Sequence, residues 1–79
     1  MPAAKDVVMY CRSWCGDCRR AKVWLQTNGV PFTEIDIEEH PAAAQKVRDM
    51  AGRIVTPCFE IDGEPVVDFD ERRLRELLL

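Results

Sequence analysis

Two cysteines separated by two residues, Cys15 and Cys18, are the side chains of this 79-residue sequence best suited to redox chemistry. A thiol attacks a disulfide as its thiolate, so a redox cysteine needs a lowered pKa and access to solvent. Residues 19–28 predict a helix that opens just after Cys15, whose sulfur would then face unpaired backbone N–H groups and the positive end of the helix dipole. Cys18 lies one turn inside that helix and is expected to be less exposed. The spacing therefore predicts Cys15 as the attacking thiol.

Charges near the two cysteines also favour a Cys15 thiolate. The neighbouring cations are Arg12, Arg19, Arg20 and Lys22. Asp17 reduces their positive charge, but we expect the cations to prevail and to lower the Cys15 pKa into the range of about 3.5 to 7.5 seen at such sites.

Residues three apart at a helix start can approach within the roughly 4.4 to 6.8 Å between Cα atoms that a disulfide requires. Cys18 can therefore resolve a mixed disulfide formed on Cys15, and Gly16 leaves the approach to that sulfur free.

Length and composition predict a single globular domain over residues 1–79. A chain this short buries only about 60% of its unfolded surface and has no material for a second core. The 47% hydrophobic and 32% charged residues are typical of a folded protein. The N-terminal region has no apolar run long enough for a signal peptide or a membrane span, so we expect a cytoplasmic protein with reduced thiols. The net charge of −3 and the interspersed cations argue against nucleic acid as a partner, and we expect a monomer.

The elements that position the cysteines follow from hydrophobic spacing and from turn residues. A buried strand over 7–10, a helix ended by Gly29 and a strand over 32–37 form a parallel βαβ unit. A second helix starts at Pro41 and ends at Gly52. Two strands, 58–61 and 65–67, surround an Asp-Gly pair that predicts a hairpin. The closing helix is expected to be capped by Asp68 or Asp70, with Glu71 completing a capping box with Asp68.

Taken together, these segments resemble the glutaredoxin family of the thioredoxin-fold superfamily. The similarity covers nearly the whole chain and is strongest toward small bacterial glutaredoxin-like redoxins, including the electron donor of ribonucleotide reductase, and the mycoredoxins. It is carried by Tyr-Cys-Arg-Ser-Trp-Cys-Gly-Asp-Cys at 10–18, by Asn-Gly-Val-Pro-Phe at 28–32, by Glu-Ile-Asp-Ile at 34–37, and by Pro57 before a strand that ends in Ile-Asp-Gly at 61–63.

The resemblance implies an α/β fold with a four-stranded mixed sheet and three helices in the order β-α-β-α-β-β-α. It implies Cys15 as nucleophile, Cys18 as resolving thiol, and a cis Pro57 facing both. In the family, the backbone of the residue before that proline, here Thr56, pairs with an extended substrate. The substrate-binding residues that we predict are Arg12, Trp14, Arg53, Thr56, Pro57 and Asp68.

Three positions depart from the family pattern. Members commonly have Thr-Val-Pro where this chain has Val-Thr-Pro at 55–57, so Thr56 places a hydroxyl beside the active site. Glutathione-binding members often have Gly-Gly where this chain has Val67 and Asp68, with Asp70 or Glu71 beyond. Val67 is bulkier, and Asp68 adds a negative charge close to where a carboxylate would lie. Cys58, directly after Pro57, is the third departure.

We therefore expect a thiol-disulfide oxidoreductase that reduces protein or mixed disulfides through its two thiols. It would need no bound cofactor or metal and would use glutathione or another low-molecular-weight thiol as co-substrate. A second hypothesis is a redoxin recharged by the flavin enzyme thioredoxin reductase and serving as an electron donor, for example to ribonucleotide reductase. A third is a module that binds an iron-sulfur cluster or a metal, and a fourth is a domain that senses redox state through its disulfide.

The remaining chemically active residues have simpler interpretations. Cys11 ends a buried strand and is expected to be a small core residue. Cys58 either packs in the core or acts as a regulatory thiol toward Cys15. Trp14 either shields the nucleophile or contacts substrate, and Arg12 and Arg53 are the cations best placed to hold the carboxylates of a tripeptide thiol or an acidic partner.

Overall fold

Strand β1 (Val7–Cys11) lies at the centre of a four-stranded sheet in the computed structural model, which describes residues 5–79. It pairs in parallel with β2 (Thr33–Asp36) and antiparallel with β3 (Cys58–Ile61). Strand β4 (Glu64–Val67) pairs antiparallel with β3, so the strand order is β2-β1-β3-β4. The predicted mixed sheet is confirmed.

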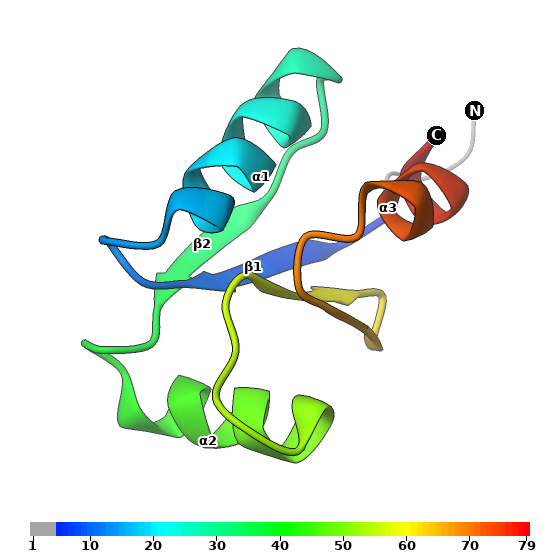
Figure 1. The fold of residues 1–79 in the computed structure, drawn as a ribbon. Helices are drawn as coiled ribbons and strands as arrows, with labels where there is room; N and C mark the ends of the chain where they lie inside the picture. Colours follow the sequence, from blue (N-terminus) through cyan, green and yellow to red (C-terminus); the bar gives the residue numbers. More distant parts are fainter. Residues whose placement is uncertain (1–4) are drawn as a thin grey trace.

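Three helices cover the two faces of this sheet (Figure 1). Helices α1 (Gly16–Thr27) and α3 (Glu71–Leu78) pack on one face, and α2 (Pro41–Ala51) packs on the other. The element order is the predicted β-α-β-α-β-β-α. No helix among residues 5–79 is long and apolar enough to cross a membrane.

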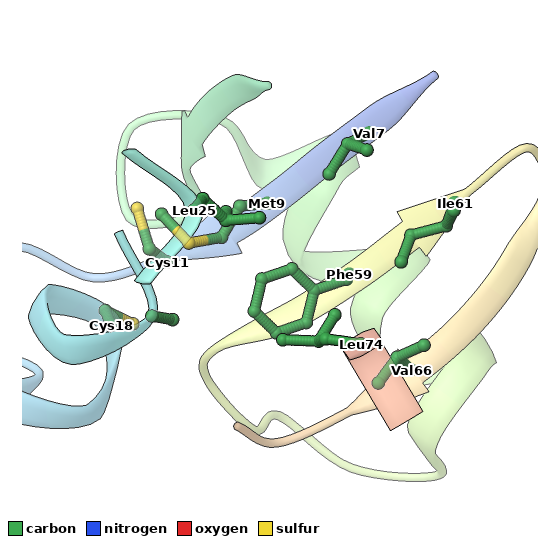
Figure 2. Packing of buried hydrophobic residues seen from close by; sticks show 10 residues of the cluster. Val7, Met9, Cys11, Cys18, Leu25, Phe59, Ile61, Val66 and Leu74 are labelled. Carbon is green, nitrogen blue, oxygen red and sulfur yellow. The ribbon is translucent and has the colours of Figure 1, made fainter. Parts of the chain in front are cut away.

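The alternation of side chains along the central strands divides the core into two clusters. Met9 of β1 and Phe59 of β3 point to the face covered by α1 and α3, where they meet Leu25 and Leu74 (Figure 2). Tyr10 and the other residues of the second cluster lie on the α2 face. The first cluster includes Cys11 and Cys18, so the start of α1 packs directly on this core.

Turn residues end the helices as the sequence predicts. Pro41 occupies the first turn of α2, and Gly52 ends that helix with a φ of 79°, in the left-handed region that glycine adopts without strain. The Asp62-Gly63 pair between β3 and β4 also has positive φ at both positions, as a tight hairpin turn requires.

The start of α3 differs from one of the two predicted arrangements. Asp70 is the N-cap, and its carboxylate accepts a hydrogen bond from the backbone N–H of Arg73 at 3.1 Å. Asp68 has a left-handed φ of 69° and accepts instead from the N–H of Phe69 at 2.8 Å. The predicted capping box of Asp68 and Glu71 is therefore wrong, because the chain turns at Asp68 before the helix begins.

Candidate active site

Cys15 is the N-cap residue of α1. Its backbone is extended, and its Sγ accepts a hydrogen bond from the N–H of Cys18 at 3.4 Å. The helix N-terminus has free N–H groups, so a sulfur placed there can be stabilised as an anion. A Cβ added at Gly16 would meet no atom within 4 Å, so the approach beside Cys15 is open. Cys15 is half-buried, whereas Cys18 is buried at 5% exposure.

The segment before β3 lies against the Cys15 sulfur. The peptide bond between Thr56 and Pro57 is cis, as the resemblance implied. The Sγ of Cys15 lies 3.5 Å from the carbonyl oxygen of Thr56 and donates to it in the thiol form. Thr56 and Pro57 are both buried, so this wall of the site is packed in the protein interior.

The two thiols have opposite pKa shifts. Burial raises the pKa of Cys15, but hydrogen bonds from the side chains of Thr56 and Cys18 and from the backbone of Cys18 and Asp17 outweigh it, so the pKa is lowered. Burial is also the largest influence on Cys18, and there it prevails and raises the pKa to about 11. The pair therefore consists of one thiol that ionises more readily than an ordinary cysteine and one that holds its proton.

The direction of the Cys15 shift agrees with the sequence-based expectation, but its causes differ. Two of the four cations expected to act on the thiolate are engaged in ion pairs. Arg20 forms an ion pair with Asp17, and Lys22 forms one with Glu34 at 2.9 Å. Hydrogen bonds to the sulfur thus replace the expected arginine and lysine charges as the main stabilising influence on the thiolate.

Arg12 connects the loop before α1 with the segment before β3. Its Nε donates to the hydroxyl of Thr56 at 3.0 Å, and its guanidinium lies 4.5 Å from the centre of the Trp14 ring. Trp14 is 65% exposed, and its indole N–H donates to Glu38 at 3.3 Å. The Trp14 ring is therefore held at the surface by contacts on both sides, close to the nucleophile in the chain.

A small hollow opens beside the two sulfurs. Its volume is about 130 Å³, which suits the end of a side chain or a few atoms of a small thiol. Glu34, which sequence reasoning missed as a site residue, reaches it because β2 runs parallel to β1 and places Glu34 opposite Met9. The lining residues are Arg12, Ser13, Cys15, Cys18, Arg19, Lys22 and Glu34.

The other predicted binding residues lie outside this hollow. Arg53 is exposed in the segment between α2 and β3 and is not among the lining residues. Asp68 is also exposed. In the antiparallel pairing of β3 with β4, Cys58 lies opposite Val67, so Pro57, which precedes Cys58, and Asp68, which follows Val67, leave the sheet at the same end. Of these two residues, the strand register brings only Asp68 toward the cis proline.

The two remaining cysteines are buried and hold their protons. Burial, followed by a hydrogen bond to Glu34, raises the pKa of Cys11 to about 12. Burial also raises the pKa of Cys58, which belongs to the cluster on the α2 face, whereas Cys15 packs against the cluster on the opposite face. Both cysteines therefore pack as core residues. Within residues 5–79, no three His, Cys, Asp or Glu side chains are grouped so that they could hold a metal ion.

Comparison with known proteins agrees with this geometry. The family model for glutaredoxin matches residues 7–66. A Mycobacterium tuberculosis protein assigned as a glutaredoxin is 41% identical over 64 residues, which cover 78% of this chain and 76% of that protein. Glutaredoxin 3 of Escherichia coli K12 is 30% identical over 66 residues, covering 84% of this chain and 80% of the relative.

A solved structure shows the same architecture. The crystal structure of a glutaredoxin from Archaeoglobus fulgidus superposes with a TM-score of 0.81 at 31% identity and covers 92% of this chain and 85% of that chain. The family match spans both thiols and the cis-proline segment. The chain described here therefore belongs to the glutaredoxin family of thiol oxidoreductases.

Proposed function

We propose that the protein is a dithiol-disulfide oxidoreductase in which Cys15 attacks and Cys18 resolves. The observation that carries this proposal is the asymmetry of the two thiols at the start of α1. Cys15 is half-buried with a lowered pKa, and Cys18 is buried with a pKa raised to about 11. A disulfide substrate thus meets the more exposed and more readily ionised thiol first, while Cys18 holds its proton.

The reaction consists of two thiol-disulfide exchanges. The Cys15 thiolate attacks one sulfur of the substrate disulfide, forms a mixed disulfide with it and releases the other substrate sulfur as a thiolate. Cys18 then loses its proton and attacks the Sγ of Cys15, which releases the second substrate thiolate. The substrate gains two electrons, and the protein is left with a Cys15–Cys18 disulfide.

The surroundings of Cys15 support a substrate that lies across the cis-proline segment. The carbonyl of Thr56 is 3.5 Å from the Cys15 sulfur, so a peptide disulfide bound at Cys15 would lie along Thr56 and Pro57. The exposed Trp14 ring and the guanidinium of Arg12 offer an apolar surface and a cation beside it. We assign Arg53 and Asp68 to the outer part of this binding surface.

The oxidised protein must be recharged by a reductant. Glutathione or another low-molecular-weight thiol is the first candidate, because glutaredoxins generally use it and the hollow beside the sulfurs has a cationic lining that suits its carboxylates. Thioredoxin reductase is the second candidate, because Val67 is 38% exposed and Asp68 carries a negative charge next to the cis-proline segment. We place this chemistry in the cytoplasm and assign it to a monomer without a bound cofactor.

Two coupled assays that follow NADPH oxidation test the chemistry and the reductant. One supplies glutathione with glutathione reductase, and the other supplies thioredoxin reductase alone, with the same peptide disulfide as substrate. Cys15→Ser is expected to abolish turnover in both, and Cys18→Ser to abolish it with the peptide disulfide. Cys58→Ala serves as the matched control and should retain activity, because Cys58 is fully buried on the other face of the sheet. Turnover by Cys15→Ser would refute the proposed function.

A further inference from the structure

Thr56 is a buried polar residue whose hydroxyl accepts one hydrogen bond from within residues 5–79 and has a hydrogen left to donate. Its side chain accepts the hydrogen bond from Arg12 Nε at 3.0 Å, and the residue is only 7% exposed. A guanidinium can only donate, so this contact uses a lone pair of the hydroxyl oxygen. The hydroxyl proton therefore remains free for an acceptor inside the site, since a buried donor without a partner is costly.

The sulfur of the nucleophile packs against the same residue. The Cys15 sulfur lies against Thr56, with 3.5 Å between Sγ and the carbonyl oxygen of Thr56. Burial raises the pKa of Cys15, and the hydrogen bond with the Thr56 side chain is the largest of the influences that lower it. The same hydroxyl also lowers the pKa of Cys18, although burial prevails there. The Thr56 side chain thus acts on both sulfurs.

We propose that the Thr56 hydroxyl donates a hydrogen bond to the Cys15 thiolate and that Arg12 is a positioning residue that turns the hydroxyl toward the sulfur. This inference rests on the proposed role of Cys15 as nucleophile and extends it to a residue type that departs from the Thr-Val-Pro of the family. It gives Arg12 a role that requires no contact with substrate.

The two protonation states of Cys15 use different atoms of the same residue. The thiol donates its hydrogen to the Thr56 carbonyl, at 3.5 Å. The thiolate has no hydrogen to give, and the hydroxyl proton of Thr56 then becomes its partner. Arg12 stabilises this arrangement because its Nε occupies the hydroxyl oxygen and its guanidinium is held over the Trp14 ring at 4.5 Å.

Thr56→Val removes a partner of Arg12, whose Nε donates to the hydroxyl, whereas the other charged groups around Cys15 keep their contacts. Several of them are already paired with each other, Asp17 with Arg20 and Lys22 with Glu34. The part of the Thr56→Val shift that exceeds the shift of Arg12→Gln can therefore be assigned to the hydroxyl itself. The charged or titratable groups that line or flank the hollow come from the loop before α1, from α1 and from β2. They are Arg12, Asp17, Cys18, Arg19, Lys22 and Glu34.

The test compares Thr56→Val, which removes the hydroxyl at nearly constant shape, with Thr56→Ser, which keeps it. The pKa of Cys15 is measured from the ultraviolet absorbance of its thiolate during a pH titration. We expect Thr56→Val to raise this pKa by about one unit, the equivalent of one hydrogen bond to a charged group. Thr56→Ser should keep the wild-type pKa, and Arg12→Gln should raise it by less than Thr56→Val does.

Reaction with a small aromatic disulfide, followed across pH, separates this role from a merely structural one. Below the wild-type pKa, a pKa higher by one unit lowers the thiolate fraction about tenfold but makes the remaining thiolate about threefold more nucleophilic, so Thr56→Val should react about threefold more slowly. Above both pKa values, it should react about threefold faster. The two pH profiles should therefore cross.

The opposite results would overturn the inference. Slower reaction of Thr56→Val at every pH with an unchanged Cys15 pKa, or an equal rise in pKa in Thr56→Ser, means that the hydroxyl does not hold the thiolate. If Cys15→Ser is inactive at the same time, the proposed function stands and only this inference fails. If Cys15→Ser still reduces the peptide disulfide, both fail.

Discussion

The resolving step should be controlled by the proton on Cys18. Burial raises the pKa of this thiol to about 11, so at pH 7 only roughly one molecule in ten thousand carries a Cys18 thiolate. In the mixed disulfide, Cys15 bears no charge, which removes its contribution to the raised pKa, but burial is the largest cause and persists. We therefore expect the resolving rate to rise by up to about tenfold per pH unit between pH 7 and 9. The attack by Cys15 should level off once its thiolate is fully formed.

Rapid mixing with a peptide disulfide, acid quenching and mass spectrometry measure the two steps separately. The mixed disulfide appears at the rate of attack and disappears at the rate of resolution. Cys11→Ala and Cys58→Ala are the matched controls, because both thiols are buried with raised pKa values and should leave the profile unchanged. A resolving rate that stays flat from pH 7 to 9 would show that the Cys18 proton does not control this step.

Three further predictions concern stability and the reductant. Leu25→Ala, at a fully buried position, should lower the free energy of unfolding in urea by about 2 to 5 kcal/mol. Val23→Ala, at 55% exposure on the same helix, should lower it by under about 0.5 kcal/mol, and equal losses in the two variants would contradict the assigned core. Asp70→Ala should lower the free energy of unfolding by about 1 kcal/mol through loss of the N-cap, whereas Asp70→Asn should stay near wild type because Asn also caps helices. An Asp70→Ala variant as stable as the wild type would mean that Asp70 is not the cap. Asp68→Asn should lower the KM for glutathione in the coupled assay by up to about fivefold, because it removes an exposed negative charge; an unchanged KM would separate Asp68 from the reductant site.

Local sequence signals predicted the helices and strands and their order, and the resemblance to the family implied the four-stranded mixed sheet. Gly52 marks the end of α2 and the Asp62-Gly63 pair marks the hairpin, because these positions have a positive φ that few residue types adopt. Pro41 marks the start of α2, because the first turn of a helix requires no hydrogen bond from its backbone nitrogen. The choice between Asp68 and Asp70 as the cap of α3 was not decided by residue type, since both are aspartates. It depends on the left-handed turn at Asp68, which only the assembled chain shows.

The thiol pair of the site was also predictable, but its surroundings were not. Cys15 and Cys18 are three residues apart, so one helix start positions both. The contact of Arg12 with Thr56 joins residues 44 positions apart, and Glu34 reaches the hollow through the pairing of β1 with β2. The expected influence of Arg20 and Lys22 failed for the same reason, because their ion pairs with Asp17 and Glu34 are set by side-chain placement.

Trapping the covalent intermediate tests the central claim most directly. Cys18→Ser is mixed with a peptide disulfide, the product is digested under acid conditions, and mass spectrometry locates the bound peptide. We predict a stable mixed disulfide on Cys15 in Cys18→Ser, and none in Cys15→Ser under the same conditions. A peptide bound to Cys11 or Cys58 instead, or a stable adduct on Cys18 in Cys15→Ser that forms as fast as the one on Cys15, would contradict the assignment of Cys15 as the nucleophile.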